Sequence, residues 1–335
     1  MTPSHAAGTL VLTRRDVAGL LDMEACIDAV ERAFRLHAEG ATVAPGVLGA
    51  HVEGGGFHVK TAGLTGAERV FAAKVNANFP GNPAHHALPT IQGVIALFDL
   101  EAGRVLALLD SIEVTSRRTA AATAVAARHL AREDASVVTV AGCGEQGRSQ
   151  LRALSRVRRV RSAFAFDRDA ESAARYASEM ARELGIEVAP VSALGDAARR
   201  SDIVVACTPA TSWILGTADV APGAFVAAVG ADAPTKQEIE PALMAASAVV
   251  VDVLEQCATI GDLHHAIDAG VMRREDVRAE LADVVSGRVE GRRSDDEIVV
   301  FDSTGTALQD VAAAALVYER ATASGVGTIV DLGGA

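Results

Sequence analysis

Four charged side chains lie within or directly after apolar segments, where charge is hardest to accommodate. Lys74 lies within VFAAKVNANFP, and Arg118 is the second arginine of RRTAAAT, at the start of an alanine-rich helix. Asp232 and Lys236 follow the apolar run GAFVAAVGA, and ligands bind at the carboxyl ends of strands in open α/β sheets. A buried cation recovers lost solvation by pairing with a ligand carboxylate. A carboxylate in a cleft can act as a general acid or base, and burial shifts its pKa towards neutral pH.

Structural roles are the alternative for the two cations. Lys74 could lie buried against Asp232 or Asp110 as an ion pair with no ligand. Arg118 could face water at the start of a helix, as we expect its neighbour Arg117 to do.

A glycine pattern in the middle of the chain predicts a dinucleotide site. Residues 142–147 read Gly-Cys-Gly-Glu-Gln-Gly, follow the apolar run SVVTVAG and open a helical segment. Gly142 permits a tight turn, Gly144 lets a pyrophosphate approach the backbone, and Gly147 allows close packing of helix on strand. The helix start, with Glu145 and Gln146, offers free N–H groups to phosphates. A glycine-rich turn without a ligand is the alternative.

The end of the next strand indicates which dinucleotide binds. Asp167 closes the run SAFAFD, where a carboxylate accepts hydrogen bonds from the adenosine ribose. Its charge repels a 2′-phosphate, which favours NAD over NADP. The neighbouring Arg168 could instead bind that phosphate, so NADP stays open.

The elements around these residues alternate between strand and helix. Apolar runs without alternation, such as SDIVVAC and SAVVVDV, are typical of strands covered on both faces. We therefore predict an α/β fold with a Rossmann-type, doubly wound parallel sheet.

The two ends of the chain differ from this middle part. The first third reads as an α+β unit, with a helix over 23–39, short strands, and an alanine-rich helix over 116–133. The last segment, 304–325, reads as one helix ended by Gly325, and we expect it to return to the first domain.

Composition excludes several classes of protein. The net charge of −12 argues against nucleic-acid binding, and no apolar run is long enough to span a membrane. The start of the chain, MTPSHAAGTLVLTRRDV, does not resemble a signal peptide.

Four scattered cysteines suggest reduced thiols and a cytoplasmic protein. We predict no metal site at Cys257, Asp262, His264 and His265, since adjacent histidines point apart on a helix. The arginines in 155–162 and 290–297 read as solvated faces.

Six stretches resemble the ornithine cyclodeaminase/μ-crystallin family, which also contains archaeal-type alanine dehydrogenases and ketimine reductases. In order they are AAKVNANFPGNP, LPTIQGVIALFD, DSIEVTSRRTAAATAVAARHLAR, AGCGEQGRSQ, VGADAPTKQEI and VFDSTGTALQD. The resemblance implies a homodimer. It also implies a substrate-binding and dimerisation domain of residues 1–117 with 308–335, and an NAD-binding Rossmann domain of residues 118–307.

The same resemblance implies roles for single residues. Lys74 and Arg118 would hold the substrate carboxylate beside the nicotinamide. Asp232 would be the acid/base for the substrate amine, tuned by Lys236. Further residues would line the cofactor: Thr115, Thr119 and Ser303.

Two stretches depart from the pattern of the family's cyclodeaminases. Those enzymes carry an early arginine, whereas GATVAPGVLGAHV has none, and GFHVKTAGL holds His58 and Lys60 where they carry an acidic residue. A lysine here repels the second amine of ornithine and suits a second carboxylate or a carbonyl. Alternatively, Lys60 extends to water from a strand edge. The loop after Asp232 also differs, reading Ala-Pro-Thr-Lys instead of the usual Pro-Gly-Lys.

These features together predict an NAD-dependent oxidoreductase that interconverts a small α-amino acid with its α-imino or α-keto acid. Such an enzyme is an imine reductase or is alanine-dehydrogenase-like. The first alternative is a redox-neutral ornithine or lysine cyclodeaminase that releases ammonia and forms proline or pipecolate. The second is a binding protein of the μ-crystallin kind, in which the cofactor serves ligand binding.

Overall fold

The computed structural model describes residues 8–332, and residues 1–7, on which the signal-peptide expectation partly falls, lie outside the described residues. The chain forms two compact units. Unit 1 comprises Met1–Arg118 with Ala307–Ala335, and unit 2 comprises Thr119–Thr306. Within residues 8–332, no helix has both the length and the apolar character that a bilayer span requires.

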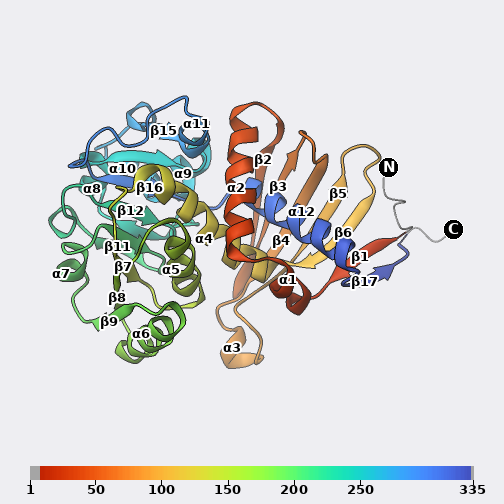
Figure 1. Cartoon of the computed structure of the whole chain (residues 1–335), viewed down its shortest axis with the longest axis horizontal. Helices are drawn as coiled ribbons and strands as arrows, with labels where there is room; N and C mark the ends of the chain where they lie inside the picture. The colour runs from red at the N-terminus through yellow and green to blue at the C-terminus, as the bar shows by residue number, and fades with distance from the viewer. Residues whose placement is uncertain (1–7, 333–335) are drawn as a thin grey trace. The chain divides into compact units, whose positions relative to one another are not determined.

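Unit 1 is built on a mixed seven-stranded sheet with the order β17-β1-β6-β5-β4-β3-β2 (Figure 1). Its strands are β1 (Thr9–Leu12), β2 (Thr42–Val52), β3 (Gly55–Leu64), β4 (Val70–Asn78), β5 (Ile91–Asp99), β6 (Val105–Asp110) and β17 (Thr328–Val330). Its helices are α1 (Arg14–Leu20), α2 (Met23–Ala38), α3 (Asn82–His85) and α12 (Ala307–Ser324). The α+β character predicted for the first third is confirmed.

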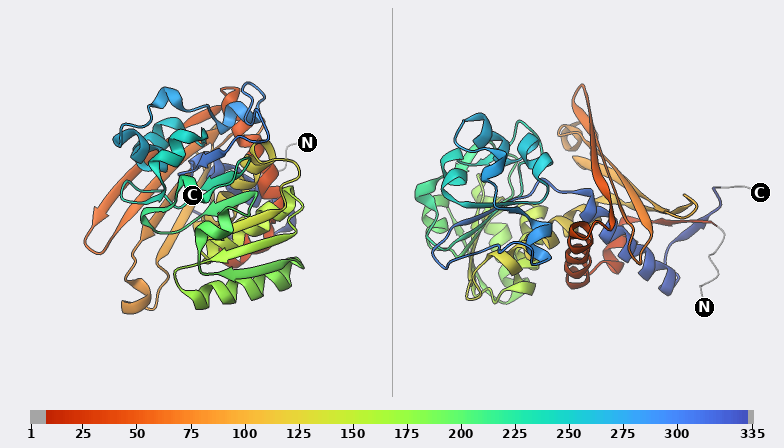
Figure 2. Two further views of the ribbon diagram at one scale, coloured as in Figure 1. Left: turned by 90° about the vertical axis from the view of Figure 1, so that its left-hand side faces the viewer. Right: turned by 90° about the horizontal axis from the view of Figure 1, so that it is seen from above.

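The two faces of this sheet differ in what covers them. Helices α2 and α12 lie on one face, where α12 contacts both β3 and β4 (Figure 2). Strand alternation places Lys60, Lys74 and Ile95 in one row on this covered face. The next row, on the opposite face, is apolar and largely exposed: Leu48, Val59, Val75 and Val94.

Strand β2 was missed from the sequence because Pro45 and two glycines interrupt it. It is the last strand in the sheet order, and proline is tolerated in an edge strand because one side of that strand needs no ladder hydrogen bonds. The pairing of β2 with β3 shifts register between Val43 and Gly46, around the proline.

Unit 2 contains an eight-stranded parallel sheet with the order β15-β14-β16-β12-β10-β7-β8-β9, which confirms the predicted doubly wound fold. Its strands are β7 (Val137–Ala141), β8 (Ser162–Phe166), β9 (Glu187–Val191), β10 (Ile203–Ala206), β12 (Phe225–Ala228), β14 (Ala248–Val251), β15 (Ala279–Glu280) and β16 (Val299–Asp302). Its helices are α5 (Glu145–Val157), α6 (Ala170–Leu184), α7 (Leu194–Ala198), α8 (Pro241–Ala246), α9 (Leu254–Ile260), α10 (Asp262–Asp268) and α11 (Leu281–Val285). A small parallel pair, β11 (Thr211–Leu215) and β13 (Gln237–Ile239), completes it.

Helix α4 (Ser111–Leu130) begins five residues before the predicted start at 116. The β-branched residues Ile112, Val114 and Thr115 hid its first turn, because such residues are weak helix formers. The carboxylate of Asp110 accepts hydrogen bonds from the backbone N–H groups of Ile112 and Glu113 and starts the helix there.

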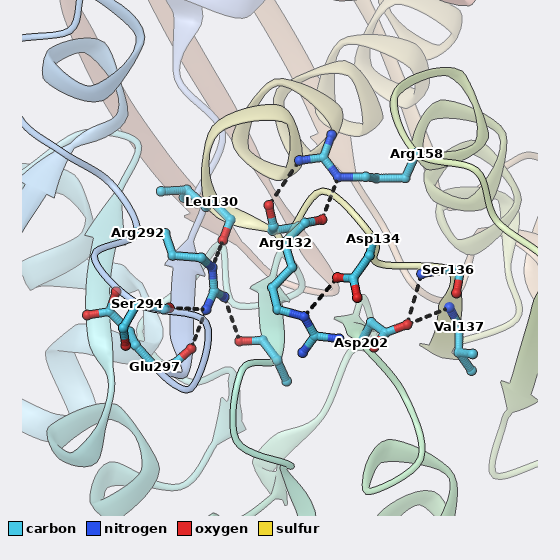
Figure 3. Close-up of polar contacts among 12 residues, drawn as sticks. Leu130, Arg132, Asp134, Ser136, Val137, Arg158, Asp202, Arg292, Ser294 and Glu297 are labelled. Atoms are coloured by element: carbon cyan, nitrogen blue, oxygen red, sulfur yellow. Dashed lines mark hydrogen bonds and ion pairs between the residues drawn. The ribbon is translucent and has the colours of Figure 1, made fainter.

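Two arginines expected on solvated faces are instead structural, so that prediction is wrong for them (Figure 3). Arg158 donates to the carbonyl oxygens of Ala127, Ala131 and Arg132, at the end of α4. Arg292 donates to the carbonyl oxygen of Leu130 at 2.6 Å. The last carbonyls of a helix have few partners within the helix, and these guanidinium groups supply donors to them. The carbonyl oxygens of Ala127 and Arg132 also accept from backbone N–H groups.

Candidate functional site

The glycine turn between β7 and α5 has the geometry of a phosphate-binding loop. Gly142 has φ +103°, which only glycine adopts without strain. A methyl group at Gly147 would lie 2.1 Å from the carbonyl oxygen of Gly142, so helix and strand approach closely only with glycine there. A methyl group at Gly144 would meet no atom within 4 Å, so the face that a pyrophosphate would approach is open.

The start of α5 leaves donors for a ligand. Its N-cap, Gly144, makes no side-chain capping bond, so the first backbone N–H groups have no capping side chain. Glu145 is exposed, and the buried Nε2 of Gln146 has no hydrogen-bond partner among residues 8–332. These residues fit a dinucleotide, since an uncapped helix start and an orphaned donor both suit a phosphate.

Asp167 lies directly after β8, beside the glycine turn. One of its carboxylate oxygens accepts a hydrogen bond from the backbone N–H of Cys143 at 2.9 Å, and the other accepts from Asp169 at 3.0 Å. These two backbone N–H groups hold the carboxylate next to the glycine turn. Arg168 is exposed at the following position.

Asp232 and Lys236 form an ion pair on the loop between β12 and β13. Lys236 Nζ lies 2.6 Å from Asp232 Oδ1, and the Asp232 side chain is 55% exposed. The loop turns tightly between them, because the N–H of Lys236 donates to the carbonyl oxygen of Ala233. The loop therefore brings Lys236 to Asp232 although it reads Ala-Pro-Thr-Lys and not the family's usual Pro-Gly-Lys.

Buried carboxylates anchor both ends of this loop. Glu238 accepts hydrogen bonds from the N–H groups of Thr208 and Gly230, and burial raises its pKa to about 8. Asp262 accepts from the N–H groups of Glu238 and Ile239, and burial raises its pKa to about 6. These carboxylates fix the loop that carries Asp232.

In unit 1, Lys74 and Arg118 share one buried carboxylate. Lys74 Nζ lies 2.7 Å from Asp310 Oδ2, and Arg118 Nε lies 2.9 Å from Asp310 Oδ1. All three side chains are buried. If Lys74 formed a structural ion pair, we expected its partner to be Asp232 or Asp110. In the structure its partner is Asp310. The sequence offered a signal that we did not use, since Gln309 and Asp310 are the polar residues in the apolar, alanine-rich first half of this helix.

Lys60 and His58 lie on β3, on the covered face of the same sheet. Lys60 is buried and directly opposite Lys74 in the β3–β4 register, and His58 is half-buried opposite Asn76. Since β3 has β2 and β4 as neighbours, the idea that Lys60 extends from a strand edge is wrong. Like charges directly opposite each other in a sheet repel, so this position disfavours a third amine nearby.

The three residues predicted to line a cofactor have different surroundings. Thr115 is half-buried on α4, and its Oγ1 has no hydrogen-bond partner within the described range. Thr119 lies one turn further along α4. Ser303 follows β16 and is buried, with its hydroxyl donating to Asp252 at 3.2 Å.

Two smaller expectations are wrong. Arg117 does not face water: it donates to the carbonyl oxygens of Ala18 and Leu21. The rings of His264 and His265 do not point apart, since their centroids are 4.2 Å from each other. The part of the chain that the structure describes contains no group of three or more His, Cys, Asp or Glu side chains placed to hold a metal.

Comparison with known proteins decides the family. The family model described as "Ornithine cyclodeaminase/mu-crystallin family" matches residues 7–325. The chain belongs to this family. The resemblance inferred from the six sequence stretches is therefore confirmed.

Similar members of the ornithine cyclodeaminase/mu-crystallin family are enzymes of amino and imino acids. The chain is 38% identical to alanine dehydrogenase of Archaeoglobus fulgidus, over 96% of this chain and 97% of that one. It is 34% identical to iminosuccinate reductase of Paracoccus denitrificans, over 96% of this chain and 100% of that one. The solved structure of an archaeal alanine dehydrogenase dimer with bound NAD matches with a TM-score of 0.92 and 37% identity, over 97% of this chain and 99% of that chain.

Proposed function

We propose that this family member is an NAD-dependent oxidoreductase that interconverts a small α-amino acid with its α-imino or α-keto acid. The observation that carries the proposal is the buried cluster in which two cations, Lys74 and Arg118, share the single carboxylate of Asp310. When Lys74 is protonated, one positive charge is left over among these three groups in a dry environment. The α-carboxylate of an amino acid is the matching ligand.

The chain's own residues would then divide the work. Lys74 and Arg118 bind and orient the substrate carboxylate. Asp232 takes up the proton of the substrate amine in one direction and returns it in the other. Lys236, at 2.6 Å, holds that carboxylate in place as its ion-pair partner. NAD, when bound, supplies the hydride acceptor or donor for the substrate Cα.

We propose NAD rather than NADP as the cofactor, held by the Gly142–Gly147 turn and by Asp167. The similar archaeal alanine dehydrogenase is solved with NAD. A carboxylate at the ribose repels the 2′-phosphate of NADP. We also propose that Thr115, Thr119 and Ser303 contact the cofactor, since the orphaned hydroxyl of Thr115 needs a partner.

A substrate screen tests this function. NADH oxidation is followed with α-keto acids plus ammonia or methylamine, with cyclic imines, and with iminosuccinate-type substrates. We expect turnover with at least one of these classes, and faster turnover with NADH than with NADPH. Absence of turnover with all of them would refute the reductase.

The redox-neutral cyclodeaminase remains the second candidate, because the family includes such enzymes. In that case ornithine or lysine would release ammonia and form proline or pipecolate without a net change in NADH. The burial of Lys60 opposite Lys74 disfavours it, since the distal amine of ornithine would add a further positive charge.

We propose a homodimer that associates through the uncovered face of the unit 1 sheet. Leu48, Val75 and Val94 are exposed there in one row. A contiguous exposed apolar surface of this kind marks an interaction site, and the similar archaeal alanine dehydrogenase is a dimer. The alanine-rich helix α12 is buried against its own sheet.

We propose the cytoplasm as the compartment, on the basis of the thiols. All four cysteines are free, and three of them are buried. Burial raises the pKa of the Cys26 and Cys143 thiols to about 12, which makes them unreactive. Unpaired thiols fit a reducing environment.

A further inference from the structure

We propose that Asp310 is a positioning residue, which fixes the orientation of Arg118 and keeps Lys74 charged so that both can bind the substrate carboxylate. The identity of the ligand rests on the proposed function, whereas the contacts themselves do not.

Asp310 joins two elements that are far apart in the sequence. Its carboxylate extends from α12 to Lys74 on β4 and to Arg118 on α4, at 2.7 and 2.9 Å. The carboxylate oxygen Oδ1 also accepts a hydrogen bond from Lys74 at 2.8 Å. Because the interior is close-packed, a carboxylate with these contacts leaves neither cation free to move.

The neighbouring residue completes the hold on Arg118. Gln309 Oε1 accepts a hydrogen bond from Arg118 Nη1 at 2.6 Å, while Asp310 faces Nε. Nη1 is thus hydrogen-bonded, whereas Nε lies at ion-pair distance from Asp310 without a hydrogen-bond partner among the described residues. The two adjacent residues of α12 together restrict the orientation of the guanidinium, which decides how a carboxylate can meet it.

The carboxylate also controls the charge of Lys74. Burial lowers the pKa of Lys74 to about 7, and the nearby Arg118 and Lys60 lower it as well. Asp310 acts in the opposite direction. Burial raises the pKa of Asp310 itself, but Arg118 and Lys74 outweigh that effect and hold it below its usual value, so this carboxyl stays ionised. Without Asp310, the pKa of Lys74 would therefore be lower still.

Stability alone gives no reason for this arrangement. Well-packed apolar residues of similar volume stabilise a core as well as a buried ion pair does, and often better. On the buried face of α12 the polar residues are Gln309 and Asp310, and the other residues are apolar. Gln309 and Asp310 are also the two residues that contact Arg118. Gln309 and Asp310 therefore lie beside Lys74 and Arg118, the two cations proposed to bind the substrate carboxylate.

Two substitutions separate charge from position. Asp310→Asn keeps the size and removes the charge, and Asp310→Glu keeps the charge and moves it by one methylene. KM and kcat for the amino or imino acid are measured from about pH 6 to about pH 9, a range that spans the pKa of Lys74. NADH affinity reports whether each variant is folded, and NMR of isotope-labelled lysine side chains reports the titration of Lys74 without any substrate.

We expect Asp310→Asn to lower the pKa of Lys74 by about one unit or more, which reduces its charged fraction at pH 7 and should raise KM about fivefold or more, with a smaller change in kcat. The ratio of its KM to that of the wild type should fall as the pH falls, because acid restores the charge on Lys74. Asp310→Glu should raise KM by a similar factor at every pH. In the NMR experiment, Lys74 should titrate at lower pH in Asp310→Asn than in the wild type.

A folded Asp310→Asn protein with wild-type KM and wild-type Lys74 titration would overturn the proposal. If Asp310→Asn does not fold, a folded Asp310→Glu protein with wild-type KM would overturn it instead. Failure of the wild type to turn over any amino or imino acid would refute the proposed function alone, since the NMR titration of Lys74 would still report what Asp310 does.

Discussion

Asp232 and Lys74 are both ionisable, but their surroundings suit different tasks. Asp232 is exposed on a loop with Lys236 at 2.6 Å, so it can exchange protons with a ligand or with water. Lys74 is buried on β4, where its charge depends on the few groups around it. At the scale of single residues, we therefore assign proton transfer to the exposed carboxylate and carboxylate binding to the buried amine.

Carboxylate binding should be accompanied by proton uptake. The pKa of Lys74 in the unliganded enzyme is about 7, and a bound carboxylate raises it. Between the free and bound pKa values, binding must add a proton to Lys74, so affinity should fall up to tenfold per pH unit above about pH 7. Isothermal titration calorimetry in buffers of different ionisation enthalpy measures the uptake.

The matched control for proton uptake is Lys74→Arg. Arginine stays protonated throughout this range, so the variant should bind without taking up a proton and without the loss of affinity above pH 7. Equal proton uptake by the wild type and the variant would contradict the role given to Lys74.

The sequence predicted individual site residues better than their partners. Lys74, Arg118 and Asp232 stand out because each is a charge within or beside an apolar run. The polar pair Gln309 and Asp310 was a visible signal, but its pairing with Lys74 was not, because Asp310 is 236 positions away and only the fold brings α12 onto β4. Arg117 was misjudged for the same reason, since its acceptors lie in the segment around α1.

At the scale of elements, the β7–α5 unit shows why each glycine is required. Gly142 provides the turn, Gly144 leaves open space, and Gly147 lets the helix approach the strand. The three positions differ in what an added methyl group would meet, and this difference can be tested.

Two alanine substitutions should separate stability from cofactor binding. Gly147→Ala should destabilise the fold by about 1–3 kcal/mol, because its methyl group would overlap the Gly142 carbonyl oxygen. Gly144→Ala meets no neighbour, so its melting temperature in the absence of NADH should stay near that of the wild type. Its NADH affinity should nevertheless fall, because the methyl group occupies the side that the pyrophosphate approaches. Unchanged NADH affinity in Gly144→Ala would contradict the assigned site.

The C-terminus of α4 depends on Arg158. Replacing Arg158 with alanine leaves three partly buried carbonyl oxygens without this donor, which should destabilise the protein by about 1–3 kcal/mol in urea denaturation. Arg159→Ala, at the exposed neighbouring position, should change stability by less than about 0.5 kcal/mol. Equal effects of both substitutions would show that the capping contacts are not stabilising.

Regular elements were predicted where hydrophobic pattern alone decides them, as in the parallel strands of unit 2. Errors occurred where a distant or local contact overrides propensity. Helix α4 begins early because Asp110 caps it, and β2 forms despite Pro45 because it is an edge strand. The first cause is readable as an N-cap aspartate directly before the helix, whereas the edge position of β2 is set by the fold.

At the scale of the whole molecule, the uncovered sheet face of unit 1 is the main unexplained surface of the single chain. Its exposed row of Leu48, Val75 and Val94 is apolar, whereas a solvated sheet face would carry polar residues. A second copy of the chain would remove this surface from water. Oligomerisation and catalysis are thus separate properties that can be tested separately.

Val75→Glu should weaken the dimer. A charge in the middle of an apolar interface is desolvated without a partner, so the variant should be largely monomeric in analytical ultracentrifugation at concentrations where the wild type is dimeric. Val271→Glu introduces the same change at an exposed valine of unit 2 and should leave the dimer intact. A Val75→Glu protein as dimeric as the wild type would exclude this face as the interface.

The central claim is that hydride passes between the cofactor and the α-carbon of an amino acid. Its most direct test is to incubate the enzyme with NADH deuterated at C4 and the best substrate of the screen, and to locate the deuterium by mass spectrometry. We predict one deuterium at Cα of the amino acid for each deuterated hydride transferred, equimolar NADH consumption, and a loss of this product in Asp232→Asn with NADH affinity retained. Product formed with no NADH consumed, or without deuterium at Cα, would contradict the account.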